Sequence, residues 1–492
     1  MKRIIYIIVI FSLTLFTTVI FSCGEQSGES NIEQSASERE IQNIQETTAE
    51  ERITDDLPNT DFGGRVFKFL SNDNGSWEEW DRLTVETETG EAINDAMIQR
   101  NRAVEERFNV KIEENRVVRD TIPAELQKSV RAGDRNYNAA YVFGIYCPGL
   151  AADGYLYDLY KLPNIDFSKA YWDQNAKTQL TMGNKLYMMT GDANIFYYVN
   201  IFTVLFNKKL LADYNIPDPY KIVKDGKWTI DKMLELGKDC PADLNGDGVV
   251  DFEDRFGLAT QSNAIGGLIF AAGEWLVTKN SNDLPEFQGT NARTMSVLQK
   301  IYELTSNTQF TYNITKPGNK GDTRTIFADD RALFTMNGFA EVKLLREEEV
   351  NFGLLPVPKY EDAQKDYYHW VAWSHSALVV PSDIDAANDG GFIGTILEAM
   401  HSESRYRLRT AFFDITLNGK FFRDEESTDM LEIILNSCFY PMIGLRDFGN
   451  LLGALQEKLV AGSNDFTSII EAREMAAQKD IEKFIEQLEK LD

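Results

Sequence analysis

Histidine is scarce in this chain, which has 492 residues but only three histidines, His369, His375 and His401. Three scattered histidines argue against a His-based metal site. The sequence also lacks His-Glu-x-x-His, Gly-x-Ser-x-Gly and a Gly-rich phosphate loop ending in Lys-Ser or Lys-Thr. These absences lower the expectation of hydrolase or nucleotide chemistry.

Positive charge is also in short supply, and the formal net charge is -27. Because nucleic-acid binding begins with neutralising phosphates, this balance argues against a DNA or RNA partner. A hydrophobic content of 43% and an aromatic content of 12% are typical of a globular protein. The length is too great for one hydrophobic core and is enough for two domains.

The N-terminus has the pattern of a secretory signal. A short basic start precedes an almost wholly apolar run over 4–21, which ends at Ser22-Cys23. The alternative is a transmembrane anchor, but a cysteine at the expected cleavage point favours a signal peptide over 1–22. Residues 20–23 resemble a bacterial lipoprotein box, which implies a lipidated Cys23, although Phe21 departs from the usual small residue. Residues 23–57 are polar and predict a disordered tether.

The folded part begins with a strand-helix-strand pattern that predicts a parallel α/β sheet. Apolar residues alternate over 65–70, recur on one helical face over 91–108, and form further strands at 109–112 and 139–143. In such sheets, ligands bind at the carboxyl ends of the strands. A second pair of apolar runs, 186–189 and 195–206, flanks a break at Gly191-Asp192, which suits a chain that passes between two lobes.

The sharpest local motif is the acidic loop 243–254, which matches the calcium pattern D-x-[DN]-x-[DN]-G. The expected ligands are Asp243, Asn245, Asp247, Asp251, Asp254 and the carbonyl of Val249. The final ligand is usually a longer Glu, so the expected affinity is weak, about 10⁻⁴ M. The alternative is an acidic solvated turn. Calcium would have a structural role here.

The order of motifs resembles the family 1 extracellular solute-binding lipoproteins of ABC importers, which are maltose-binding-protein-like. The resemblance runs from about Arg65 to the C-terminus. Its marks are the strand-loop-helix opening and the segments 154–159, 205–210, 227–231, 327–339, 352–358 and 416–427.

The resemblance implies a periplasmic-binding-protein fold, with two α/β lobes joined by a multi-crossing hinge around a ligand cleft. Lobe 1 is expected over 58–191 and 358–405, and lobe 2 over 192–357 and 406–492. The implied function is to capture a sugar or oligosaccharide, or another small molecule, and to deliver it to ABC permease subunits. The protein is expected to be a monomer and not an enzyme. It is expected to lie on the extracellular face of the membrane, held by its lipid anchor, or in the periplasm.

Aromatic faces and planar polar groups recognise sugars, so both are expected in the loops of the cleft. The expected ligand-binding residues are Asn72, Trp77, Tyr146, Asp192, Asn263, Trp275, Phe339 and Trp373. The alternative for each ring is a place in the core, because the chain has 30 Phe and 20 Tyr.

Two other classes of function compete with a binding protein. One is a secreted carbohydrate-active enzyme with a dockerin-like calcium loop, but a dockerin needs two such loops and the chain has one. The other is a calcium sensor, which needs a second loop and a Met-rich groove. Beyond Cys23, the cysteines Cys147, Cys240 and Cys438 allow one disulfide with a free thiol, or three thiols.

Overall fold

The structure is a computed structural model that describes residues 52–289, 291–345, 348–417 and 425–491. The predicted signal peptide, Cys23 and most of the tether therefore lie outside the described residues. The described residues from 53 to 491 form one compact unit. Everything below concerns that compact unit.

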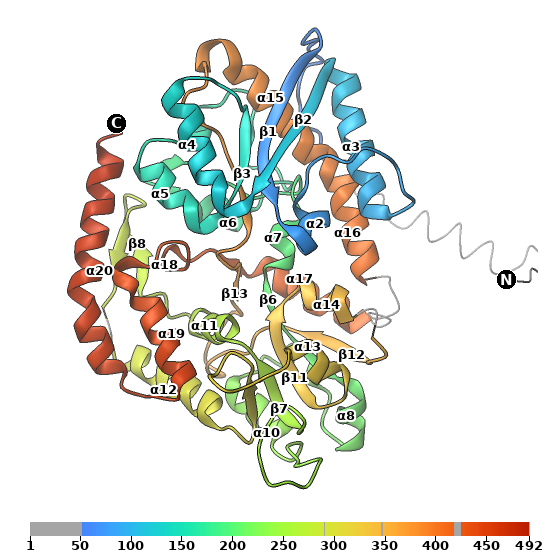
Figure 1. Ribbon diagram of the computed structural model, residues 1–492, viewed down its shortest axis with the longest axis vertical. Helices are drawn as coiled ribbons and strands as arrows, with labels where there is room; N and C mark the ends of the chain where they lie inside the picture. The colour runs from blue at the N-terminus through green and yellow to red at the C-terminus, as the bar shows by residue number, and fades with distance from the viewer. Residues whose placement is uncertain (1–51, 290, 346–347, 418–424, 492) are drawn as a thin grey trace, which may run out of the picture. The chain divides into compact units, whose positions relative to one another are not determined.

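The first sheet has the strand order β14-β3-β1-β2. Strand β1 (Arg65–Asp73) pairs in parallel with β2 (Val110–Val118) and β3 (Ala139–Phe143), while β14 (Ser376–Val379) pairs antiparallel with β3. The helices α3 (Ala92–Phe108), α4 (Ile122–Ala132) and α15 (Ala386–Tyr406) pack around it (Figure 1). The predicted opening of an α/β sheet is confirmed.

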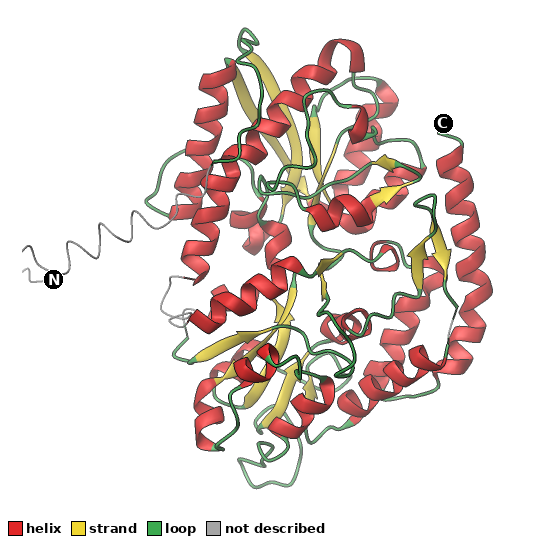
Figure 2. Ribbon diagram, turned by 180° about the vertical axis from the view of Figure 1, so that it is seen from behind, coloured by secondary structure: helices red, strands yellow, loops and turns green. Residues whose placement is uncertain are grey.

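The second sheet has five strands in the order β10-β7-β11-β6-β12. Its parallel members are β10 (Thr311–Asn313), β7 (Phe256–Thr260) and β11 (Ala332–Gly338). Strand β6 (Phe202–Asn207) runs antiparallel to β11 and to β12 (Phe352–Leu355). Figure 2 shows the two sheets as separate layers, each with its own helices.

The second sheet is covered by helices from several parts of the chain. They are α8 (Lys208–Asp213), α9 (Pro219–Lys224), α10 (Ile230–Gly237), α11 (Ser262–Ala271), α12 (Ala292–Ser306), α13 (Thr323–Ala328), α14 (Ala340–Leu344) and α17 (Glu425–Asn436). Side chains at their starts hold several of them: Asn207, for example, accepts from the Leu210 N–H (2.9 Å) and caps α8.

The sequence predicted a single strand over the run 195–206, and this prediction is wrong. The run forms a short helix, α7 (Phe196–Val199), and then β6. All four residues of α7 are buried, and an apolar run that is buried all round shows no period that separates helix from strand. The other predicted strand, over the run 186–189, is also shorter than expected. Here the structure has the two-residue strand β5 (Lys185–Leu186), paired with β4 (Thr181–Met182).

Several chain segments connect the parts that carry the two sheets. The chain passes from β5 to β6, and from β12 through β13 (His369–Trp370) to β14; β13 pairs in parallel with β15 (Cys438–Phe439). Helix α16 (Leu408–Leu417) packs against α3 of the first sheet, and α17 packs against β12 of the second. The sequence prediction placed the start of lobe 2 at residue 406, before α16.

Helix α20 (Phe466–Glu489) runs beside both parts of the molecule (Figure 1). It packs against α12 and α19 (Leu451–Ala461) and also against α5 (Cys147–Ala152). Its apolar stripe includes Ile470, Ile481 and Phe484, all buried. Its N-cap residue is Asp465, which makes no side-chain capping hydrogen bond.

The remaining helical elements are short. They are α2 (Glu78–Asp81), α6 (Gln174–Leu180), α18 (Met442–Leu445), η1 (Gly75–Trp77), η2 (Arg119–Thr121), η3 (Gly144–Tyr146), η4 (Leu159–Lys161) and η6 (Phe448–Asn450). A hairpin of β8 (Val277–Lys279) and β9 (Pro285–Phe287) completes the unit. No helix in the described part of the chain combines the length and the apolar character needed to cross a membrane. Cys147, Cys240 and Cys438 are buried free thiols.

Candidate functional site

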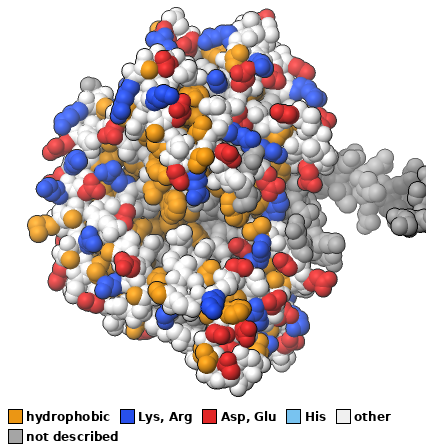
Figure 3. Space-filling model, in the orientation of Figure 1, with side chains coloured by type: hydrophobic (Ala, Val, Ile, Leu, Met, Phe, Trp, Pro, Cys, Tyr) orange, Lys and Arg blue, Asp and Glu red, His pale blue; other side chains and the backbone are white. Residues whose placement is uncertain are grey.

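A cavity of about 560 Å³ lies between the two sheets. Its lining comes from the ends of β1, β2, β3, β7 and β11 and from the segment that follows β13. Most of these are carboxyl ends of strands, where open α/β sheets bind ligands. Figure 3 shows a hollow in the middle of the face that is seen in Figure 1, with hydrophobic side chains gathered beside it.

The first-sheet side of the cavity is mainly aromatic. Trp77 is half-buried in η1 and lies 5.4 Å, centroid to centroid, from the buried ring of Trp80. Phe143 at the end of β3 lies 6.0 Å from Phe196 in a stacked arrangement. Rings held by other rings keep little conformational freedom, so they present a fixed apolar surface to a ligand.

A buried acid organises the backbone behind Trp77. Asp81 accepts hydrogen bonds from the side-chain amides of Asn72 (3.0 Å), Asn74 (3.1 Å) and Asn194 (3.1 Å). Burial raises the pKa of Asp81 to about 6, although hydrogen bonds from Ser376, Asn194 and Asn72 lower it. The network joins β1, α2 and the segment after Gly191, and it places Asn74 in the cavity wall.

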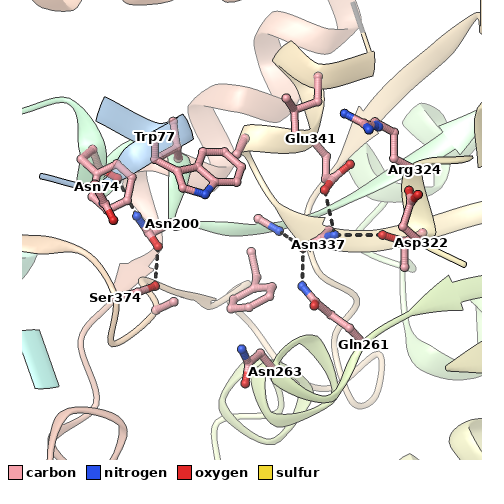
Figure 4. A pocket seen from close by; sticks show the side chains of 18 of the residues that line it. Asn74, Trp77, Asn200, Gln261, Asn263, Asp322, Arg324, Asn337, Glu341 and Ser374 are labelled. Carbon is pink, nitrogen blue, oxygen red and sulfur yellow. Dashed lines mark hydrogen bonds between the residues drawn. The ribbon is translucent and has the colours of Figure 1, made fainter. Parts of the chain in front are cut away.

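The second-sheet side of the cavity is a chain of linked polar groups (Figure 4). Gln261 Nε2 donates to Asn337 Oδ1 (2.6 Å), and Asn337 Nδ2 donates to Thr323 Oγ1 (3.0 Å) and Glu341 Oε1 (3.0 Å). Burial raises the pKa of Glu341 to about 7, against the opposing charge of Arg324. Fixed donors and acceptors of this kind orient a ligand.

The floor of the cavity comes from the segments that join the two sheets. Ser374 Oγ donates to Asn200 Oδ1 (2.6 Å), and Asn200 Nδ2 donates to the Phe196 carbonyl (2.8 Å). The Ala372 N–H donates to the Asn200 carbonyl (2.9 Å). One further contact spans the two parts, an ion pair between Lys343 of α14 and Glu79 of α2.

Two of the predicted ligand residues, Trp77 and Asn263, line this cavity. Asn263 lies at the start of α11, and its side chain projects toward the cavity in Figure 4. Both follow the carboxyl end of a strand, β1 and β7 respectively. These two residues lie where strand-end loops are expected to line a cavity; whether they contact a ligand stays a prediction.

Three predicted residues lie away from the cavity and have partners within the protein. Asn72 is fully buried and also donates to Ser376 Oγ (2.8 Å). Asp192 is buried, accepts from Tyr198 OH (2.8 Å) and pairs with Arg405 (3.5 Å) and Arg409 (3.6 Å). Tyr146 OH donates to Asp120 (2.9 Å).

Phe339 and Trp373 also lie outside the cavity lining, although their sequence neighbours belong to it. Phe339 is buried, 6.3 Å from the Phe412 ring, while Gly338 and Ala340 line the cavity. Trp373 is half-buried between Ala372 and Ser374, which line it. Phe339 has helical backbone angles at the start of α14, and Trp373 lies in a turn. In such backbone, a cavity-lining neighbour in sequence does not bring a side chain to the cavity.

Trp275 belongs to a different cavity, of about 1010 Å³. Its ring stacks on Phe439 at 4.5 Å and meets Tyr368 edge-on at 5.3 Å. Residues 365–368, directly before β13, line this second cavity, whereas Ala372 and Ser374, shortly after β13, line the cavity between the sheets.

The predicted calcium loop is a tight loop held by its own side chains. Asp243 accepts from the N–H groups of Gly246 (2.6 Å) and Gly248 (2.9 Å), and Asp254 accepts from those of Leu244 (3.1 Å) and Asp251 (3.1 Å). Within the described residues, no three His, Cys, Asp or Glu side chains form a group that could hold a metal ion. The carboxylates that the motif supplies serve the loop backbone, and calcium binding stays a prediction.

Sequence reasoning missed most of the polar lining. Three of these lining residues lie at or just after the carboxyl end of a strand: Gln261 after β7, Asn337 near the end of β11, and Arg119 after β2. The rule that ligands bind at strand ends would have included them if the sequence had shown where these three strands end. Glu341 and Arg324 lie on α14 and α13, where only the folded arrangement brings them to the cavity.

Comparisons with known proteins add a family and a fold. A family model described as "Bacterial extracellular solute-binding protein" matches residues 100–391, which is more than half of the chain. A search of curated proteins returns no match.

Many solved structures are similar to this one. A cyclo/maltodextrin-binding protein complexed with maltotetraose is 12% identical, covers 87% of this chain and 97% of its own, and gives a TM-score of 0.56. An ABC substrate-binding protein from Listeria monocytogenes, in complex with cycloalternan, is 13% identical (85% and 99% covered, TM-score 0.55). The maltose/maltodextrin-binding domain MalE from Bdellovibrio bacteriovorus, bound to maltotriose, is 16% identical (85% and 100%, TM-score 0.54). At such identities the likeness shows the fold, a two-lobed periplasmic-binding-protein fold.

Proposed function

Because this chain belongs to the bacterial extracellular solute-binding proteins, we propose that it captures an oligosaccharide between its two sheets and delivers it to an ABC permease. The observation that carries the proposal is the opposition of an aromatic wall to a wall of linked amides. Trp77 lies on one side, and Gln261, Asn263 and Asn337 lie on the other.

This arrangement suits the two kinds of surface that a sugar presents. The C–H face of a pyranose ring packs on an aromatic face, and its hydroxyls need donors and acceptors in fixed positions. A cavity of about 560 Å³ is within the usual range for small-molecule sites, roughly 300–1,000 Å³. The similar structures named above were solved with maltotetraose, cycloalternan and maltotriose.

A panel of neutral and uronate oligosaccharides, tested on the mature protein by thermal shift and then by calorimetry, tests the proposal. We expect saturable binding of at least one glycan, with no product formed. Glycan cleavage detected by chromatography would instead favour the secreted carbohydrate-active enzyme. No binding across the whole panel would reject the proposed ligand class.

We also propose that Cys23 carries the lipid that anchors the protein outside the cell, next to its permease. The apolar segment before Cys23 and the polar tether after it support this proposal. We expect mass spectrometry of the membrane fraction to find diacylglyceryl-Cys23 at the mature N-terminus. An intact Met1 on membrane-bound protein would contradict the proposal.

The loop 243–254 is proposed to bind calcium in a structural role. The spacing of its oxygen donors and the left-handed Gly246 and Gly248 match a calcium loop. To bind calcium, Asp243 and Asp254 would have to turn from the loop N–H groups that they bond in this structure. At a site of about 10⁻⁴ M, millimolar calcium stabilises the fold by about 1.4 kcal/mol. Asp247→Ala is expected to abolish the calcium-dependent rise in melting temperature and to leave glycan affinity unchanged. If a chelator does not move the wild-type melting curve, the loop has no such site.

A further inference from the structure

Two guanidinium groups line the cavity between the sheets, one from each side. Arg119 comes from η2, directly after β2 of the first sheet, and Arg324 comes from α13 beside the second sheet. Arg119 lies over the Phe143 ring, with its Cζ 5.5 Å from the centroid. Its one ion pair within the described residues is with its chain neighbour Asp120, at 3.5 Å.

Arg324 has no hydrogen bond or ion pair within the described part of the chain. It is half-buried, and Figure 4 shows it beside Asp322 and Glu341. Its charge acts on Glu341, but its N–H groups have no acceptor within the described residues. A guanidinium has five N–H donors in a fixed fork, so a partly desolvated one is costly unless a ligand supplies acceptors.

The carboxyl groups of the cavity, in contrast, already have partners. Asp322 accepts from the Thr325 N–H (2.8 Å) and from Thr325 Oγ1 (2.8 Å), and so caps α13. Glu341 accepts from Asn337 Nδ2. Among the charged side chains that line the cavity, the ones with no hydrogen bond within the described residues are therefore the two guanidiniums, in a chain whose net charge is -27.

We propose that the ligand is an oligosaccharide that carries carboxylates, such as an oligouronate, an inference that rests on the proposed function. A carboxylate offers two coplanar acceptors that match the guanidinium fork, whereas a hydroxyl matches only one N–H at a time. The ring of the same sugar still packs on Trp77. The overall negative charge of the protein disfavours anions at long range, so local guanidiniums must supply the attraction.

Calorimetry with trigalacturonate and with galactotriose, two trimers that differ in the carboxylate, tests this inference. We expect trigalacturonate to bind at least tenfold more tightly at low salt and to weaken as sodium chloride is raised. Arg324→Gln and Arg119→Gln should each weaken trigalacturonate at least tenfold and change galactotriose less than threefold. Arg324→Lys keeps the charge without the fork, so it should lose part of the affinity.

The control is Arg102→Gln on α3, an exposed residue that pairs with Glu88 (3.4 Å) and lies outside the cavity lining. It removes the same charge and should change neither affinity. If neutral glycans bind and all uronates in the panel do not, or if both cavity variants bind trigalacturonate as the wild type does, the inference is overturned and the proposed function stands. If no glycan of either kind binds, both fail.

Discussion

The two sides of the cavity are built differently. On the first-sheet side, Trp77 lines the cavity, and the buried acid Asp81 nearby in sequence accepts hydrogen bonds from three amides outside the aromatic surface. On the second-sheet side, the hydrogen-bonded residues line the cavity themselves. Asn337 accepts a hydrogen bond from Gln261 and donates one to Glu341.

The difference separates groups that shape the site from groups that contact the ligand. Asp81 is fully buried and does not line the cavity, so its loss acts first on the fold. Asn337 does line the cavity, so its loss acts on the fold and on the ligand together. Substitutions on the two sides therefore give different ratios of lost stability to lost affinity.

The largest expected effect is on the first-sheet side. Asp81→Ala leaves the buried amides of Asn72, Asn74 and Asn194 without their acceptor, at about 1–3 kcal/mol each. We expect urea unfolding to show a loss of at least about 3 kcal/mol, against about 1 kcal/mol for Asn337→Ala on the other side. Equal losses in the two variants would erase the distinction between the sides.

The next effect is on affinity. Trp77→Ala removes the aromatic platform and is expected to weaken any bound oligosaccharide at least tenfold, with the melting temperature little changed. Trp275→Ala is the matched control, because this Trp lies in the other cavity, and it should leave affinity within twofold. Calorimetry on both variants measures this, and a larger loss in the Trp275 variant would move the ligand to the second cavity.

The smallest effect is a pH dependence on the second-sheet side. Because the folded pKa of Glu341 is about 7 and its ordinary value is 4.5, the native state holds the proton more strongly, and the unfolding free energy falls as pH rises from about 4.5 to 7. Glu341→Gln should remove roughly 1–2 kcal/mol of that fall in the unfolding free energy. The expected amount is smaller than the whole pKa shift of Glu341 would give, because this side chain is only partly buried.

Glu398 provides the control for that measurement. Its pKa is also raised to about 7 by burial, but it accepts from Trp172 Nε1 (2.9 Å) and Tyr171 OH, away from the cavity. Glu398→Gln should flatten the stability profile in the same pH range and leave ligand affinity unchanged at every pH. Unchanged profiles in both variants would place the proton uptake elsewhere.

The family and the fold class were predictable from the sequence, because strand and helix periods over 65–143 and the order of motifs survive at low identity. Trp77 and Asn263 were predictable because they follow strand ends. Phe339 was not, because its buried position depends on the packing of Phe412 from a distant part of the chain. The position of Asp192 outside the lining of this cavity was unpredictable for a similar reason: Arg405 and Arg409, which pair with it, are remote in sequence.

Rings were the least predictable candidates. A chain with 30 Phe and 20 Tyr offers an aromatic residue near most loops, and sequence does not say which face of a ring is covered. Trp275 illustrates this limit of the sequence. It packs against Phe439 and Tyr368 and lines the second cavity, not the cavity between the sheets.

The first sheet has a consequence for how the chain folds. Its strand β3 pairs with β14, so that Phe143 meets Ser376, and the whole second sheet lies between them in sequence. Such distant pairing slows folding, because the loop must close before the contacts form. Until β14 is present, β3 is an edge strand whose residues Ala139–Phe143 are all apolar, the kind of edge that recruits other chains. A chain cut between β3 and β14 should therefore aggregate rather than form half of a binding protein.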